Sequence, residues 1–191
     1  MAEIEKSRVK RAFSRHAEQY ESLALVQKRV AERFLELFLG LGTVPETLLD
    51  IGSGTGRIVN ALSQKLPDSS VTGLDLAYGM LSSAKKSFVG NTGIKLVCGD
   101  AETLPFRDNS FDMVVSTSTY QWLNPLATSF AEVWRVLKPG GRFCFALFGE
   151  KTLFELKDSY STAVRLLQRC LSDRTHQFAD CSAVQQALDS A

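Results

Sequence analysis

The stretch LLDIGSGTGR, residues 48–57, decides the fold of this chain. It places Gly52, Gly54 and Gly56 directly after a short apolar run, and a helix-like stretch follows them. Glycines let a backbone turn tightly and approach a ligand closely, and the first turn of a helix offers unpaired N–H groups. Strand, glycine loop and helix in this order predict the ligand-binding turn of a doubly wound α/β sheet.

The same pattern continues along the chain, because short apolar runs alternate with amphipathic stretches up to Phe148. Parallel strands joined by crossover helices have this signature. The predicted strands are 47–52, 70–75, 94–99, 111–117 and 141–148, and the predicted helices between them are 57–65, 78–88 and 126–137. Lys138, Pro139, Gly140 and Gly141 are expected to end the last helix, in which Trp134 is expected to face the core. We therefore predict an open, Rossmann-like sheet of five parallel strands.

Helical patterns also flank the sheet. Residues 9–20 place apolar side chains and arginines on opposite faces, and residues 25–39 form a second helical stretch. Beyond the sheet we expect helices at 152 to about 171 and at 183–188. We expect one domain over 1–191, with covering helices at 1–45, a ligand-binding core at 46–149 and a helical part at 150–191.

Bulk composition excludes several classes of function. The chain has 22 Lys and Arg against 21 Asp and Glu, which argues against bulk attraction to nucleic acid or lipid. No apolar run is long enough to span a membrane or resembles a secretory signal, so we expect a cytoplasmic protein. The four cysteines, Cys98, Cys144, Cys170 and Cys181, lack metal-ligand spacing. We expect them to be reduced and packed as small apolar residues, and we expect no metal.

The acidic residues at the predicted strand ends suggest a nucleoside ligand without phosphates. Arg57 stands where the dinucleotide fingerprint GxGxxG needs its third glycine, and the chain has no GxxxxGK[ST] loop. Asp50 suits a cationic amino-acid end of the ligand, and Asp75 suits two ribose hydroxyls. Asp100, with Glu102 close by, suits the exocyclic amine of adenine. Each acid has the alternative of capping a helix or lying on the surface.

Four segments together resemble the class I S-adenosylmethionine-dependent methyltransferases in order and spacing. They are LLDIGSGTGR (48–57), TGLDLAYGML (72–81), CGDAETLPFRDNSFDMVVS (98–116) and EVWRVLKPGGRF (132–143). VKRAFSRHAEQY (9–20), TYQWLNPLATSFAEVWRVLKPGG (119–141) and FGEKTLFELKDSY (148–160) narrow the resemblance to the malonyl-acyl-carrier-protein O-methyltransferases of biotin synthesis (BioC). This narrower resemblance extends to about residue 178.

The resemblance implies S-adenosylmethionine as cofactor and S-adenosylhomocysteine as product. The implied cofactor-binding residues are Tyr20, Gln27, Asp50, Gly52, Ser53, Gly54, Gly56, Asp75, Leu76, Met80, Asp100, Ala101, Glu102 and Ser116. Ser53 stands where many relatives carry cysteine. Tyr20, Gln121 and Trp122 are implied beside the reacting groups, although Tyr20 and Trp122 have the alternative of packing in the core. Tyr120 and Phe148 are expected to complete an aromatic wall.

The implied reaction is methyl transfer to the free carboxylate of a malonyl group on an acyl carrier protein. A carboxylate is ionised at pH 7, so no general base is required, and His16 and His176 lie outside the motifs. Carrier proteins are acidic, and two basic clusters are available, unless they are only solvated helix faces. The clusters are Lys6, Arg8, Lys10, Arg11 and Arg15, and Arg165, Arg169 and Arg174.

Two other functions share the cofactor motifs: methyl transfer to a small, quinone-type molecule, and a non-catalytic assembly factor that binds the cofactor. We expect a monomer or weak dimer. Class I domains end in two further strands, and no segment after residue 148 has that pattern. We expect either a shortened chain or a fifth strand whose free edge needs cover.

Overall fold

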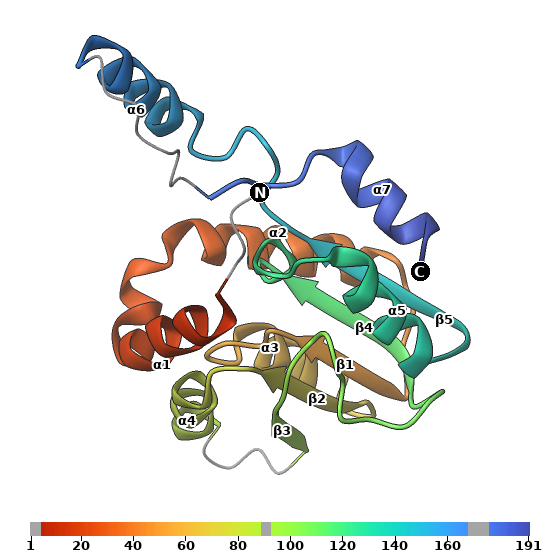
Figure 1. Ribbon diagram of the computed structural model, residues 1–191. Coiled ribbons are helices and arrows are strands. Elements are labelled where there is room, and N and C mark those ends of the chain that lie inside the picture. The colour runs from red at the N-terminus through yellow and green to blue at the C-terminus, as the bar shows by residue number, and fades with distance from the viewer. Residues whose placement is uncertain (1–4, 89–92, 168–175) are drawn as a thin grey trace.

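The computed structural model describes residues 5–88, 93–167 and 176–191, and it contains the predicted parallel sheet (Figure 1). The strands are β1 (Thr47–Ile51), β2 (Ser70–Asp75), β3 (Ile94–Cys98), β4 (Phe111–Thr117) and β5 (Leu137–Ala146). Their order is β3-β2-β1-β4-β5, and all neighbouring pairs are parallel. The direction of winding reverses between β1 and β4, which is where doubly wound sheets bind ligands.

Helices cover both faces of the sheet. They are α1 (Lys6–Leu23), α2 (Leu25–Gly40), α3 (Arg57–Lys65), α4 (Tyr78–Ser87), α5 (Leu126–Val136), α6 (Phe154–Leu166) and α7 (Cys181–Asp189), with a 3-10 turn, η1, at Tyr120–Trp122. Successive residues of β1 enter opposite cores: Leu48 packs with α2 and α3, whereas Leu49 packs with α5. Burial on both faces explains why the middle residues of β1, β2 and β4 are mostly apolar. Among the described helices, none is long and apolar enough to cross a bilayer.

The end of α5 differs from the prediction, because β5 begins directly at Leu137. Leu137 pairs with Phe111, and the register then shifts before Met113 pairs with Arg142. The turn expected at residues 138–141 is therefore an irregularity inside the strand, with Gly140 at φ +80°. Lys138 holds it in place by donating to both carboxylate oxygens of Asp112, at 2.9 and 3.0 Å.

Trp134 and two cysteines contradict the predicted core. Trp134 is 76% exposed, because the face of α5 that meets the sheet is formed by Phe130, Val133 and Val136. Cys98 and Cys181 are exposed and Cys144 is half-buried, and all three are free thiols. Cys170 lies outside the described residues. The end of the helix predicted for 152–171 also lies outside the described residues. In the structure this helix is α6, which projects away from the sheet (Figure 1).

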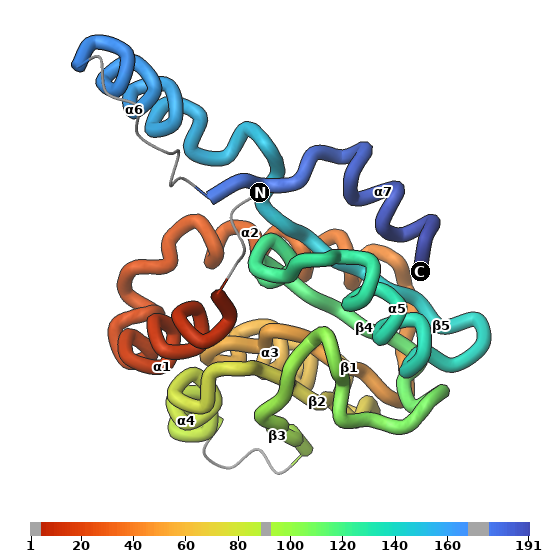
Figure 2. Tube along the Cα trace, viewed as in Figure 1, coloured from red at the N-terminus to blue at the C-terminus, as the bar shows by residue number. Residues whose placement is uncertain are grey.

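The helix α1 lies alongside α4 (Figure 2). The two backbones meet at Gly79, where an added Cβ would lie 2.5 Å from the carbonyl oxygen of Ser14. Ala17, Ala77 and Met80 are buried in this contact. The absence of a side chain at Gly79 therefore sets how closely α1 approaches the carboxyl ends of the strands.

We predict that Gly79→Ala loosens α1 and leaves the sheet intact. Overpacking costs about 1–3 kcal/mol, so amide hydrogen exchange in α1 should accelerate by roughly 10-fold or more. Amides of β1 and β4 should keep their protection. Gly40→Ala, whose added Cβ would meet no atom within 4 Å, is the matched control. Equal exchange of α1 in both variants would show that the contact at Gly79 does not hold the helix.

Candidate active site

The glycine loop after β1 turns beneath the end of β2. Gly52, Gly54 and Gly56 all have left-handed backbones, with φ of +74°, +55° and +83°. The N–H groups of Gly52 and Ser53 donate to the carbonyl of Leu74 at 2.7 and 2.9 Å. A side chain at position 52 would overlap Thr119, so this glycine allows the loop after β4 to approach the loop after β1.

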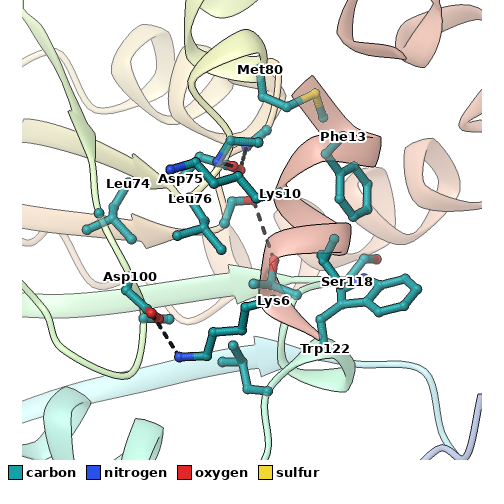
Figure 3. A pocket seen from close by; sticks show the side chains of 18 of the residues that line it. Lys6, Lys10, Phe13, Leu74, Asp75, Leu76, Met80, Asp100, Ser118 and Trp122 are labelled. Atoms are coloured by element: carbon teal, nitrogen blue, oxygen red, sulfur yellow. Dashed lines mark hydrogen bonds and ion pairs between the residues drawn. The ribbon is translucent and has the colours of Figure 1, made fainter. Parts of the chain in front are cut away.

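A pocket opens at this edge of the sheet, beneath α1 (Figure 3). Its walls come from five segments that are distant in sequence: α1, the glycine loop, and the chain after β2, β3 and β4. The lining residues are Lys6, Val9, Lys10, Phe13, Tyr20, Gly52, Gly54, Leu74, Asp75, Leu76, Ala77, Met80, Gly99, Asp100, Ala101, Thr117, Ser118, Thr119, Trp122 and Leu123. A second cavity shares Tyr20, Gly52 and Gly54 with it and adds Gln27, Asp50 and Ser53.

The carboxylate of Asp75 is fixed by two backbone donors. Its Oδ2 accepts from the N–H of Gly54 at 2.8 Å, and its Oδ1 accepts from the N–H of Ala77 at 2.7 Å. Burial raises the pKa of Asp75, and the two hydrogen bonds only partly oppose this rise. Each oxygen keeps a lone pair that can accept from a ligand hydroxyl.

Asp50 lies deeper, in the second cavity, and only 1% of it is exposed. Burial, and then the charge of Asp75, raise the pKa of Asp50 to about 8. Its Oδ2 and the hydroxyl of Ser53 have no hydrogen-bond partner among the residues described. Buried polar atoms without partners are costly, so this corner is suited to a ligand that carries donors or positive charge.

The acids after β3 hold the start of α1. Lys6 Nζ donates to Asp100 Oδ2 at 2.8 Å (Figure 3). It also lies 2.5 Å from Glu102 Oε2. Burial lowers the pKa of Lys6, but the hydrogen bonds and charges of the two acids together outweigh it, and the pKa is raised. Asp100 lines the pocket, whereas Glu102 lies behind it and faces Lys6 instead of the predicted ligand.

The other end of α1 is held by Glu21, which is hydrogen-bonded to the Thr55 hydroxyl and ion-paired with Arg57. Burial raises the pKa of Glu21, but these partners and Lys28 outweigh it, so the pKa is lowered. The N-terminal helix is therefore joined by ion pairs to the chain after β3 and to the glycine loop, with the pocket between them.

Aromatic rings form the wall next to the end of β4. The ring of Phe13 meets those of Tyr20 and Trp122 edge to face, each with centroids 6.0 Å apart. Behind Trp122, the ring of His176 lies at 4.8 Å, and its Nε2 is 2.8 Å from the carbonyl oxygen of Gln121. His176, which lies outside the sequence motifs, therefore supports the residues at the wall of the pocket.

Several predicted site residues do not line the first pocket. They are Gln27, Asp50, Ser53, Gly56, Glu102, Ser116, Tyr120, Gln121 and Phe148. The Ser116 hydroxyl is buried and donates to Ile51 O at 2.7 Å, so the wall is formed by Thr117–Thr119 instead. The Gln121 side chain turns inward and donates to Ser118 O at 2.6 Å.

Three of these residues belong to other packing clusters. Gly56 directly precedes α3 and packs against Phe88, where a side chain would overlap the ring. The Tyr120 ring stacks on Phe130 in the core with centroids 5.1 Å apart. Phe148 packs against Phe178.

Comparison with known proteins assigns the chain to a protein family. The family described as "Methyltransferase domain" matches residues 49–145. The chain is 46% identical to the malonyl-[acyl-carrier protein] O-methyltransferase of Geobacter sulfurreducens, over 98% of its own length and 70% of the relative. The chain belongs to the class I S-adenosylmethionine-dependent methyltransferases. Its cofactor is S-adenosylmethionine.

Two further similar proteins are also described as methyltransferases. The protein of the same name from Methylococcus capsulatus is 38% identical over 93% of this chain, which spans 62% of that relative. A solved structure from Methanococcus maripaludis, described as an S-adenosyl-l-methionine-dependent methyltransferase, is 32% identical. It matches with a TM-score of 0.59 over 83% of this chain and 71% of its own.

The side chains at the pocket of this methyltransferase are chemically suited to the cofactor. The unpartnered oxygen of buried Asp50 is suited to the cationic amino-acid end, and the two acceptors of Asp75 suit a pair of ribose hydroxyls. Leu76 and Met80 add apolar side chains to the pocket lining, which suit the faces of a planar base. In the described residues, no group of His, Cys and carboxylate side chains could hold a metal ion.

We predict that Asp50 makes the stability of the ligand-free protein depend on pH. Its pKa rises from about 4 in the unfolded chain to about 8 in the folded protein, so unfolding is favoured as pH increases between these values. The free energy of unfolding should fall by up to about 1.4 kcal/mol per pH unit. Asp50→Asn, which has a similar shape but cannot ionise, should weaken this dependence.

Urea denaturation between about pH 5 and about pH 8 measures the effect. Asp68→Asn, at an exposed position, is the control and should keep the slope of the unchanged protein. If Asp50→Asn also keeps that slope, Asp50 does not lose a proton in this range on unfolding.

Proposed function

We propose that this methyltransferase transfers a methyl group to the free carboxylate of a malonyl group carried by an acyl carrier protein. The observation that carries the proposal is the aromatic wall of Phe13, Tyr20 and Trp122, which adjoins the pocket acids and offers no free general base. Two malonyl-[acyl-carrier protein] O-methyltransferases, from Geobacter sulfurreducens and Methylococcus capsulatus, support the same acceptor.

The titratable groups at the pocket favour a carboxylate acceptor over a phenol. They are Lys6, Lys10, Tyr20, Asp75 and Asp100. Asp75 and Asp100 already accept hydrogen bonds, and burial raises the pKa of Tyr20, which therefore stays protonated. A phenol would need a base to ionise it, whereas a malonyl carboxylate is ionised at neutral pH.

The residues expected to hold the cofactor divide by chemical type. Asp75 would accept from the ribose, Asp100 and Ala101 would meet the adenine edge, and Leu76 and Met80 would flank the ring. Gly52 and Gly54 would lie along the methionine part, whose amino group would reach Asp50 and Ser53. The helices α1 and α2 would cover the site, because Lys6 and Glu21 hold α1 across it.

When bound, the cofactor supplies a methyl group on a positively charged sulfur. The acceptor carboxylate approaches as an anion, and both charges disappear in the products, so a water-poor pocket favours the transfer. Trp122 and Phe13 exclude water from the acceptor side by their edge-to-face contact. Gln121 is a positioning residue, because its hydrogen bond to Ser118 O fixes the turn from which Trp122 projects.

The acceptor is tested by incubating the protein with S-adenosylmethionine and malonyl-carrier protein, then weighing the intact carrier by mass spectrometry. We expect one added methyl on the malonyl carrier and none on the unacylated carrier or on a quinone precursor. Transfer to the quinone precursor alone would favour the small-molecule alternative. Calorimetric binding of S-adenosylhomocysteine without transfer to any acceptor would contradict the proposal and favour an assembly factor.

Trp122→Ala should lower kcat/KM for the malonyl carrier by roughly 10- to 100-fold, because an aromatic wall contributes about 1–3 kcal/mol to holding the acceptor. Calorimetry should show little change in S-adenosylhomocysteine affinity. Trp134→Ala removes the same side chain from an exposed position and is the matched control. Equal activity of the two variants would exclude Trp122 from the acceptor site.

A further inference from the structure

The helix α1 has two faces of different chemistry. Its inner face lines the pocket with Lys6, Val9, Lys10, Phe13 and Tyr20. Arg8, Arg11 and Arg15, spaced three and four residues apart, lie together on the opposite face, and all three are exposed. The structure therefore divides the basic cluster predicted from sequence: two lysines face the pocket and three arginines face solvent.

The three outer arginines form few interactions with the rest of the described chain. Arg8 approaches Glu5 at 3.8 Å, and both side chains are largely exposed, at 79% and 60%. Exposed pairs of this kind contribute little energy. Arg11 and Arg15 make no ion pair with any acid in the described parts of the chain. Their charges remain available to a partner.

We propose that the outer face of α1, formed by Arg8, Arg11 and Arg15, binds the acidic surface of the carrier protein that delivers the acceptor. The inference rests on the proposed function. Charge complementarity supports it: the chain as a whole is nearly neutral, at +1, so a local basic face is needed to attract an acidic partner.

The position of this face is also suitable. The helix that carries it is the roof of the pocket, and a helix with its side chains is only about 10 Å across. A carrier bound there would hold its flexible acylated arm within one helix diameter of the pocket. The second predicted basic cluster is less suitable, because Arg165 lies on α6, which has no buried residue, and Arg169 and Arg174 lie outside the described residues.

The test reverses the charge of this face in the full chain: Arg8→Glu, Arg11→Glu and Arg15→Glu together. Glutamate favours helix about as well as arginine, so α1 should be retained. Two acceptors are compared, malonyl-carrier protein and the small thioester malonyl-coenzyme A. We expect KM for the carrier to rise roughly 10-fold or more, with transfer to the small thioester and calorimetric affinity for S-adenosylhomocysteine unchanged.

The matched control reverses three exposed arginines that line neither cavity, Arg33, Arg107 and Arg142, and so changes the net charge equally. It should leave KM for the carrier near that of the unchanged protein. Added salt should raise KM of the unchanged protein more than that of the α1 variant. A second variant, with glutamine at the three α1 positions, should give a smaller rise in the same direction.

Three results would contradict the proposal that the carrier binds this face. They are an unchanged KM for the carrier in the α1 variant, an equal rise of this KM in the control variant, or an equal loss of activity of the α1 variant on both thioesters. Each would show that the arginines do not specifically recognise the carrier. Failure of the proposed function has a different signature, because the unchanged protein would then methylate neither malonyl thioester.

Discussion

The hydrogen bonds from the N–H groups of Gly54 and Ala77 to the carboxylate of Asp75 join the glycine loop to the end of β2. They set the separation of β1 and β2 at their carboxyl ends and leave acceptor lone pairs directed at the pocket. Burial, and then the charge of the same carboxylate, raise the pKa of Asp50 behind it. The fold thus places two acids, Asp50 and Asp75, close together at one edge of the sheet, which suits a ligand that carries donors or positive charge.

The acids at the strand ends also explain the position of α1. Lys6 forms ion pairs with Asp100 and Glu102, Glu21 forms one with Arg57, and Gly79 lets the helix backbone approach α4 closely. These contacts are partly exposed and charged, whereas the sheet is held by buried apolar side chains. Ion pairs at a surface are weaker than core packing, so the contacts at the two ends of α1 stabilise the protein less than the packing of the sheet does.

Most of the sheet could be predicted from sequence, because β2 and β4 are short, largely apolar segments bounded by turn residues, and both have the bounds expected from that pattern. The irregularity in β5 could not be predicted, because it depends on the hydrogen bond from Lys138 to Asp112, which lies on another strand. The inward direction of the Ser116 hydroxyl could not be predicted either, because it depends on the carbonyl oxygen of Ile51 on the neighbouring strand, and Thr117–Thr119 line the pocket. Strand ends predicted Asp75 and Asp100, but Lys6 reaches Asp100 across 94 residues, a contact that no local spacing reveals.

The pair Gln121 and Trp122 shows how one motif can combine two physical tasks. Gln121 is buried and holds the carbonyl of Ser118, whose left-handed backbone, at φ +55°, would otherwise be strained without compensation. From the other side, the Nε2 of His176 contacts the carbonyl oxygen of Gln121, and its ring packs against the indole at a tilted angle. The wall at Trp122 is therefore supported from two sides, one local and one contributed by a segment 55 residues away. Because the support is polar and the exposed surface of the wall is aromatic, the site can be rigid and poor in water at the same time.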